Sequence, residues 1–286
     1  MILITGAGGK TGRALIQALS KVESLSAFVH RQEYVSIVKS LGAGQVLVGD
    51  MRDDSAIRSA MQGVRAVYHV CPNMSPDEVV IGAVVLREAR KAGVTHFVYH
   101  SVLHPQTEKM KHHWQKLHVE EMIFESGLPF TILQPAPYMQ NLLAGWESIL
   151  DEGVLRVPYS VHSKFSFVDL EDVAEAARIV FSEPNHKNAV YELAGTVPVS
   201  HLEVAEILSR VLKREVGAEE LEISDWKIGA KGLNEYAIEN LIKMFEYYDR
   251  WGLVGNPNVL KWVLRRNPTS LEGFSDRIVK EHDAGP

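Results

Sequence analysis

The chain has 286 residues, which at about 150 residues per domain corresponds to roughly two domains. Hydrophobic residues make up 46% and charged residues 23% of it, an ordinary globular mixture that excludes a disordered, collagen-like or coiled-coil chain. Thirty Lys and Arg against 36 Asp and Glu give a net charge of −6. Nothing in this balance attracts nucleic acid, and we expect no such partner.

A single cysteine, Cys71, excludes an internal disulfide and a Cys-rich zinc site, and we expect no bound metal. The first residues lack a basic stretch followed by a long apolar core, so we expect no signal peptide. The longest apolar run, residues 79–86, is far shorter than the roughly 20 residues of a membrane span. These features predict a soluble, cytoplasmic protein without a membrane partner.

Short apolar runs alternate with segments of helical spacing in the first half of the chain. We expect strands at 2–5, 27–29, 46–48, 66–70, 97–100 and 131–133. We expect helices at 11–21, 33–41, 53–62, 77–92 and 112–126. This β-α alternation predicts a doubly wound parallel sheet of the Rossmann type, an α/β fold, over residues 1–134.

The pattern becomes mainly helical after Pro135, and four of the five tryptophans lie beyond it. Helices are expected at 138–151, 169–182, 200–213, 234–248, 257–265 and 270–281, with short strands at 165–168 and 190–193. No linker separates the halves. We therefore predict that residues 135–286 form a smaller substrate-binding region packed on the first domain. A strand at 190–193 that returns to the sheet would interleave the two.

A glycine-rich loop joins the first expected strand to the first expected helix. Gly6, Gly9 and Gly12 fit the spacing G-x-x-G-x-x-G, and Lys10 and Thr11 lie between the last two. Glycines let the backbone approach a pyrophosphate, whose charge the helix N-terminus then favours. The alternative is a tight strand-to-helix turn without a ligand. The position of the loop favours a dinucleotide site formed by these five residues.

The end of the second expected strand indicates which dinucleotide is bound. NAD-binding proteins usually have an acidic residue about 20 residues after the loop. Here His30 and Arg31 end the strand, and Arg31 lies 19 residues after Gly12. An arginine pairs with a 2′-phosphate, whereas a carboxylate repels it. We predict NADP as the preferred cofactor. NAD is the alternative, with Arg31 solvated and Glu33 serving the ribose.

Two further strand ends contribute expected cofactor contacts. Asp50 and Met51 follow the third strand, where the carboxylate would accept a hydrogen bond from the adenine amino group, unless it serves only as a turn or cap residue. Cys71 and Pro72 follow the fourth strand, beside the expected path of the pyrophosphate and ribose. No feature of the sequence suggests a lowered pKa for Cys71, so we do not expect a nucleophile.

Taken in order along the chain, these and later motifs resemble the NmrA-like branch of the short-chain dehydrogenase/reductase superfamily. The motifs are the glycine loop of residues 5–12, Gly49-Asp50, His100-Ser101-Val102, Ser126-Gly127-Leu128-Pro129, Gln134-Pro135, Asn141-Leu142-Leu143, Phe167-Val168-Asp169, Asp172-Val173-Ala174 and residues 191–195. The resemblance implies an NAD(P)H-dependent quinone or dye reductase, or a cofactor-binding regulator with little or no catalysis.

The helix expected at 112–126 carries the candidate active site. His112 and Lys116 fall on its inward stripe, and lysine heads avoid burial unless paired. Reductases of the superfamily have Tyr-x-x-x-Lys here, so the resemblance implies that Lys116 binds the nicotinamide ribose. His112 replaces the tyrosine, as a candidate acid or simply as a helix-start residue.

Three other residues complete the candidate site. Ser101 matches the substrate-orienting Ser or Thr of the superfamily and would also contact the cofactor, although a plain polar strand end is an equal alternative. Pro135 is expected near the nicotinamide, with Tyr138 as a second candidate acid or a substrate wall.

The missing tyrosine disfavours carbonyl-to-alcohol chemistry, because a nascent alkoxide needs a proton. A quinone or cationic dye needs mainly a well-positioned nicotinamide. We therefore expect an NAD(P)H-dependent oxidoreductase whose acceptor is a quinone-like or conjugated small molecule. A non-catalytic NADP-sensing regulator is the alternative, and a sugar-nucleotide epimerase or dehydratase is a weaker one. A homodimer and a regulatory protein partner are both open.

Overall fold

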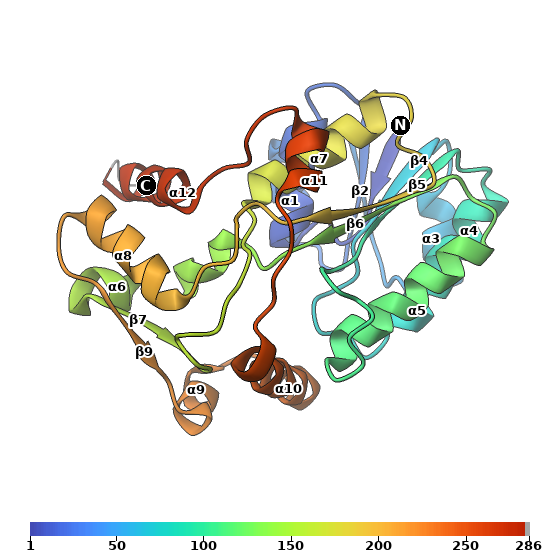
Figure 1. Cartoon of the computed structure of the whole chain (residues 1–286). Coiled ribbons are helices and arrows are strands. Elements are labelled where there is room, and N and C mark those ends of the chain that lie inside the picture. The colour runs from blue at the N-terminus through green and yellow to red at the C-terminus, as the bar shows by residue number, and fades with distance from the viewer. Residues whose placement is uncertain (284–286) are drawn as a thin grey trace. The chain divides into compact units, whose positions relative to one another are not determined.

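The computed structural model describes residues 1–283. Its main sheet contains β1 (Ile2–Ile4), β2 (Leu25–Val29), β3 (Gln45–Val48), β4 (Ala66–His69), β5 (His96–His100), β6 (Phe130–Pro135) and β8 (Ala189–Leu193). The helices around it are α1 (Lys10–Leu19), α2 (Tyr34–Ser40), α3 (Asp54–Ala60), α4 (Glu78–Lys91), α5 (Lys111–Glu125) and α7 (Leu170–Ser182). The expected α/β fold is confirmed (Figure 1).

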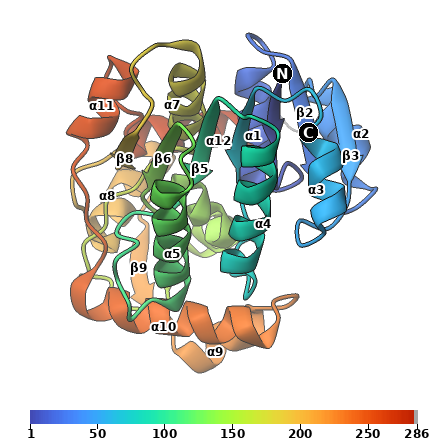
Figure 2. The ribbon, with the colours of Figure 1, turned by 90° about the vertical axis from the view of Figure 1, so that its right-hand side faces the viewer.

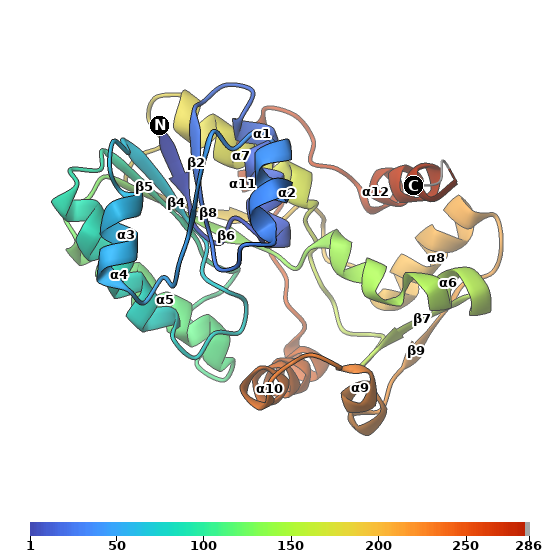
Figure 3. The same cartoon turned by 180° about the vertical axis from the view of Figure 1, so that it is seen from behind.

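The strands lie in the order β3-β2-β1-β4-β5-β6-β8, and every neighbouring pair from β3 to β6 is parallel. Helices α3, α4 and α5 cover one face of the sheet, which Figure 2 shows in front. Helices α1 and α2 lie on the opposite face, as the view from behind shows (Figure 3). The winding reverses between β1 and β4, and the carboxyl ends of strands at such a switch point form the usual ligand crevice of this fold.

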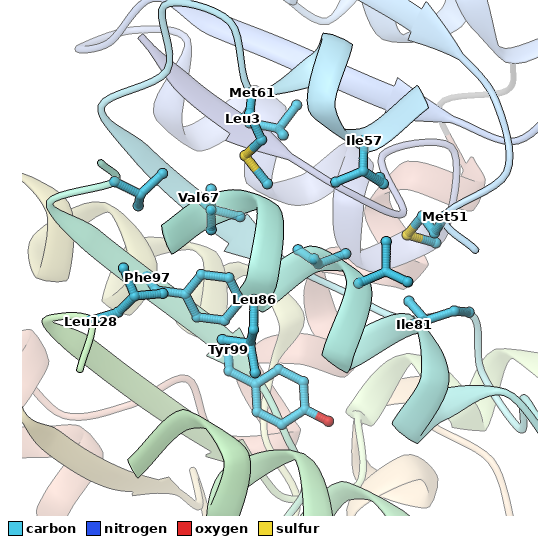
Figure 4. Close-up of a cluster of buried hydrophobic side chains, with 14 of the residues drawn as sticks. Leu3, Met51, Ile57, Met61, Val67, Ile81, Leu86, Phe97, Tyr99 and Leu128 are labelled. Atoms are coloured by element: carbon cyan, nitrogen blue, oxygen red, sulfur yellow. The ribbon is translucent and has the colours of Figure 1, made fainter. Parts of the chain in front are cut away.

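An apolar core between the sheet and α3, α4 and α5 fixes these strand ends in place. Leu3, Val67, Phe97 and Tyr99 point from the strands into this core (Figure 4). All four are completely buried. The Tyr99 ring packs within the core, and its hydroxyl points away from Phe97 toward the edge of the cluster. The strand interiors are therefore rigid, and the residues just after them are held in place.

The described chain divides into two compact units, each held by its own contacts. The first contains residues 1–134 and 173–191, and the second contains residues 135–172 together with those from 192 onward. Strand β8, expected at 190–193, pairs with β6 at the edge of the main sheet. The first unit is therefore built from two separate segments of the chain.

The second unit is mainly helical, as its sequence pattern predicts. It contains a 3-10 helix η1 (Met139–Gly145), α6 (Trp146–Glu152), β7 (Val154–Val157), α8 (His201–Leu212), β9 (Gly217–Glu220), α9 (Ile223–Gly229), α10 (Glu235–Trp251), α11 (Asn258–Leu264) and α12 (Leu271–Asp283). Strands β7 and β9 form a separate parallel pair. Aromatic rings of Tyr159, Phe165, Phe245 and Tyr248 pack edge-on or tilted against one another to form its core.

Two expectations for this unit are wrong. The single helix expected at 138–151 is a 3-10 helix followed by α6. The strand expected at 165–168 is instead an extended segment with isolated bridges, in which Phe165 pairs with Val199 and Leu253. All four residues of this segment are buried within the second unit. Among the described residues, no helix combines the length and hydropathy that crossing a bilayer requires.

Two buried aspartates in the Val-Asp and Asp-Val-Ala motifs hold the second unit together. Asp169 accepts hydrogen bonds from Arg277 at 2.7 Å and from the Gln140 side chain at 2.7 Å. Asp172 accepts from Arg266 and from the backbone N–H of Thr269, both at 2.6 Å. A buried carboxylate needs such partners, so these motifs have a structural role.

Candidate cofactor-binding and catalytic site

Packing within the chain accounts for two of the three loop glycines. Gly6 has a φ of +60°, which favours glycine, and a Cβ there would lie 2.5 Å from the carbonyl oxygen of Val70. A Cβ on Gly12 would lie 2.5 Å from the Cα of Ala7. Both distances are much shorter than real contacts. The fold therefore requires glycine at these two positions whether or not a ligand binds.

Gly9 has no such internal reason to be glycine. Its backbone is extended, with a φ of −78°, and the nearest atom to an added Cβ is the Gly6 carbonyl oxygen at 3.4 Å. The residue is exposed and precedes α1, whose first turn has no side-chain cap and no acidic residue. Free N–H groups at a bare helix N-terminus suit an anion. The site therefore fits the pyrophosphate of a dinucleotide that lies over Gly9, beside Lys10 and Thr11.

Two arginines gather beside the loop around one aromatic ring. The guanidinium of Arg31 lies 5.9 Å and that of Arg13 lies 5.5 Å from the centre of the Tyr34 ring. Arg13 also donates from Nε to the carbonyl of Gly8 at 2.8 Å. Arg31 is exposed and pairs with Glu33 at 3.2 Å. Two cations at the end of β2 suit a phosphate monoester.

Arg13 was missed in the sequence reasoning, although its position directly after Gly12 was a usable signal. It lies in the first turn of α1, and its hydrogen bond to Gly8 holds it beside the loop. His30 is exposed at the end of β2. The phosphate-binding candidates on this side of the first unit are therefore Arg13 and Arg31.

Asp50 carries a negative charge that is already balanced by an arginine. Both its oxygens bind the side chain of Arg52, at 2.6 to 3.1 Å, and it accepts the Arg52 backbone N–H at 2.9 Å. These hydrogen bonds lower the pKa of Asp50 to about 2. The neighbouring Met51 is buried in the apolar core of the first unit. The geometry fits a turn aspartate that retains spare acceptor capacity for an adenine amino group.

The end of β4 meets the glycine loop through Thr5. Its hydroxyl bonds to His69 Nδ1 at 2.8 Å, and the N–H of Val70 donates to it at 3.0 Å. Cys71, the next residue, is 6% exposed, and burial raises the pKa of its thiol. A neutral thiol is a poor nucleophile. Cys71 belongs to the buried apolar core, and the exposed Pro72 contributes the surface beside the loop.

Lys116 is buried at the carboxyl end of β5 and is held by three groups. Its Nζ donates to Glu78 Oε1 at 3.0 Å and to the carbonyl oxygen of His100 at 3.2 Å, and it lies 5.2 Å from the centre of the Tyr99 ring. Only 6% of its side chain is exposed. Lysine has three N–H donors, so one remains after these two hydrogen bonds.

Glu78 was not a candidate in the sequence reasoning. It is the first residue of α4, is completely buried, and also accepts a hydrogen bond from the Tyr99 hydroxyl at 2.8 Å. Burial opposes its ionisation, but the Lys116 ammonium, His112 and the Tyr99 hydroxyl together outweigh burial, and the pKa of Glu78 lies below its usual range. Glu78 is therefore the partner that the buried Lys116 requires, and the two form a buried ion pair.

His112 lies beside this pair, on the inward face of α5. Burial, followed by the nearby Lys116 ammonium, lowers its pKa to about 3. The imidazole is therefore neutral near pH 7. In the part of the chain that the structure describes, its Nδ1 has no hydrogen-bond partner. The geometry brings His112 and Lys116 together but gives no imidazolium to act as an acid.

Ser101, which follows β5, is committed to a second buried carboxylate. Its hydroxyl donates to Glu120 of α5, and the Gln134 amide donates to both oxygens of that carboxylate at 2.9 and 3.0 Å. Burial raises the pKa of Glu120. Gln134, from the Gln-Pro motif, therefore joins β6 to α5. The remaining capacity of Ser101 toward a ligand is that of an acceptor.

Pro135 and Tyr138 belong to the second unit. Pro135 is buried at the end of β6, and Tyr138 is half-buried before η1, where it forms an isolated bridge with Val168. The carbonyl of Val168 also accepts the N–H of Met139 at 2.9 Å. Tyr138 is thus held on the second unit, whereas Lys116, His112 and Ser101 are held on the first.

Comparison with known proteins places the chain in a family. The model of the NmrA-like family matches residues 1–277. The NAD(P)H azoreductase of Xenophilus azovorans is 30% identical over 219 residues, covering 76% of this chain and 75% of the relative. Quinone oxidoreductase 2 of Escherichia coli is 29% identical over 275 residues, covering 95% and 96%. The crystal structure of the NADPH-dependent quinone oxidoreductase of Escherichia coli with NADPH has a TM-score of 0.85 and 26% identity, covering 98% of this chain and all of that one. The chain therefore belongs to the NmrA-like family.

Proposed function

We propose that this protein is an NADPH-dependent oxidoreductase that transfers hydride to a quinone-like or other conjugated small molecule. The observation that carries the proposal is Gly9, a glycine that the fold does not need, at a bare helix N-terminus beside the switch point of the sheet. The relatives named as an azoreductase and a quinone oxidoreductase support the same reaction class.

Each part of the dinucleotide has a matching set of residues. The N–H groups after Gly9 would bind the pyrophosphate, and Arg31 with Arg13 would bind the 2′-phosphate. Asp50 and Met51 would contact the adenine. Cys71 and Pro72 would line the path toward the nicotinamide, whose ribose would meet the third N–H of Lys116. When bound, NADPH supplies the hydride.

The proposed acceptor class follows from the protonation states at the ends of β4 and β5. His112, His100 and His69 are neutral, since burial is the main cause that lowers their pKa values to between about 3 and about 4. Burial and the neighbouring Glu78 raise the pKa of Tyr99 well above its usual value. None of these groups readily gives a proton to an alkoxide. A conjugated acceptor spreads the incoming charge and takes its proton from water, so it suits this site.

An acceptor screen tests the proposal. Purified protein with NADPH is mixed with quinones, azo and triphenylmethane dyes, enones and simple ketones, and cofactor oxidation is followed at 340 nm. We expect turnover with quinones or dyes and little with ketones. If cofactor binding is measurable but no acceptor supports turnover, the reductase assignment is wrong.

A cofactor-sensing regulator is the second candidate, and the absence of an available acid beside Lys116 favours it. It predicts that the protein distinguishes NADPH from NADP+ by affinity and binds a partner in only one of the two states. Calorimetric titration with both forms separates the candidates. Equal affinities, together with turnover in the screen, would exclude the regulator.

A further inference from the structure

The only carboxylate bonded to Lys116 in the described chain is that of Glu78, and it comes from a different helix. Its Oε1 binds Lys116 Nζ at 3.0 Å and the Tyr99 hydroxyl at 2.8 Å, and the side chain has no exposed surface. Within residues 1–283 its other oxygen, Oε2, has no hydrogen-bond partner. The Cys71 thiol, a weak donor, also interacts with this carboxylate. Burying a carboxylate is costly even so, which argues that its place beside the lysine is under functional constraint.

Most of the titratable groups around this pair are uncharged near neutral pH. The titratable groups that face Lys116 are His69 and Cys71 at the end of β4, Tyr99 and His100 on β5, and His112, His113 and Glu120 on α5. The four histidines are neutral above pH 5, and burial keeps the thiol and the phenol protonated well above neutral pH. The other nearby carboxylate, Glu120, is bonded to Ser101 and Gln134, so Glu78 is the carboxylate that bonds the ammonium directly.

A buried lysine without an anion loses its proton more readily and samples other rotamers. Glu78 prevents both, because it draws Nζ toward the end of β5 while the His100 carbonyl fixes it from a second direction. The third N–H then has a defined direction. This is the geometry that a hydroxyl of a cofactor ribose would require.

We infer that Glu78 is a positioning residue, which keeps Lys116 charged and aimed at the cofactor in place of the tyrosine that this chain lacks. The inference rests on the proposed function for the role of Lys116 toward NADPH. A Glu78 that served only to stabilise the fold would change the stability of the protein but would not change the pH dependence of NADPH binding. A positioning Glu78 acts on the cofactor only through the lysine.

The test compares Glu78→Gln, Lys116→Met and the double variant with the wild type, by NADPH titration at pH 6.5, 7.5 and 8.5. Glu88→Gln is the matched control, since Glu88 is also a buried carboxylate of α4 but pairs with Arg58 at 3.0 Å and Lys91 at 2.7 Å. We expect the affinity of Glu78→Gln to fall about tenfold from pH 6.5 to 8.5. The wild type and Glu88→Gln should stay within twofold of each other at each pH.

In the Lys116→Met background, adding Glu78→Gln should change the affinity by less than twofold at every pH. The inference is overturned if Glu78→Gln weakens binding equally in both backgrounds, or if its affinity is as pH-independent as that of the control. The double variant leaves no unpaired charge at this pair of positions, so it keeps the comparison available if Glu78→Gln alone does not fold.

A measurement without cofactor separates this inference from the proposed function. If wild-type protein does not bind NADPH, the proposed function fails, and urea unfolding of the four proteins still tests the pair. Coupling of Glu78 and Lys116 predicts that the double variant is more stable than Glu78→Gln alone. Additive losses would show that the two residues act independently and would overturn the inference.

Discussion

Replacing Gly9 by alanine separates folding from cofactor binding. The added Cβ meets only the Gly6 carbonyl oxygen, at 3.4 Å, which is an ordinary contact, and a φ of −78° suits any L-residue. Alanine restricts the unfolded chain more than glycine does, which stabilises the variant by about 0.4–1 kcal/mol. Gly9 is also the N-cap of α1, where alanine is less favourable than glycine, so the free energy of unfolding should stay within about 1 kcal/mol of that of the wild type.

The same Cβ would occupy the space that a phosphate oxygen needs in order to reach the N–H groups of α1. Losing one charge-assisted hydrogen bond costs about 1.5–3 kcal/mol. The dissociation constant for NADPH should therefore rise about 10- to 150-fold. Gly12→Ala is the contrasting variant, because its Cβ would lie 2.5 Å from backbone atoms of Ala7 and Gly6. It should lose about 1–3 kcal/mol of stability from overpacking.

Two assays decide the matter. NADPH fluorescence titration gives the affinity, and urea unfolding followed by circular dichroism gives the free energy of unfolding. If Gly9→Ala binds NADPH as tightly as the wild type, no ligand approaches this residue and the argument from the spare glycine is wrong. A loss of stability as large as that of Gly12→Ala would show that the loop packs more tightly than the contacts indicate.

Three further predictions follow from the geometry. Arg31→Ala should weaken the binding of NADPH by about 1.5–3 kcal/mol and change the dissociation constant for NADH by less than twofold. Parallel titrations with the two cofactors measure this. Equal losses of affinity for both would remove the basis for preferring NADP. The buried histidines have lowered pKa values, so the native state binds fewer protons than the unfolded state and stability is lost as the pH falls below about 6.5. His112 alone should contribute up to about 2 kcal/mol to the loss between pH 7 and 5, and urea midpoints should therefore depend less on pH in His112→Gln than in a variant of the exposed His118 on the same helix. Asp169→Asn should lower the free energy of unfolding by about 3 kcal/mol, because it leaves Arg277 without its buried partner. Glu175→Gln, at a half-exposed carboxylate, is the control in the same thermal assay. A smaller loss of stability in Asp169→Asn than in this control would contradict the prediction.

Local patterns predict the first unit well because they are also what builds it. Strand β1, the loop and α1 follow one another within 18 residues, and each has its own signal in the sequence. The glycine spacing indicates a ligand site because a residue without a side chain lets the backbone approach a ligand, and this effect depends on nearby residues only. The sequence could not separate Gly9 from Gly6, since that distinction depends on Val70, the residue that follows β4.

The parts that were missed depend on contacts between distant residues. Glu78 follows Asp77 at the start of a helix, where acidic residues are common because they favour the helix dipole. Nothing nearby shows that this side chain turns inward to a lysine 38 residues away. His112 was an acid candidate on its ordinary pKa, and only the folded chain shows the burial and the ammonium that keep it neutral. Strands β7 and β9 lack an alternating apolar pattern, and they form a parallel pair with each other across a long stretch of sequence. Neither strand is therefore indicated by its own local sequence.

The ionisation pattern and the missing tyrosine point to the same chemistry. An alkoxide forming beside Lys116 would need a donor, yet the ammonium is shared with Glu78, the nearby imidazoles are neutral, and the Ser101 hydroxyl is directed at Glu120. A lysine without a carboxylate partner would place a net positive charge at this edge, which favours an anionic transition state. The buried carboxylate cancels that charge. The site therefore gives little stabilisation to a localised alkoxide. A quinone, which delocalises the incoming charge, or a cationic dye, which is neutralised by hydride, depends less on such stabilisation.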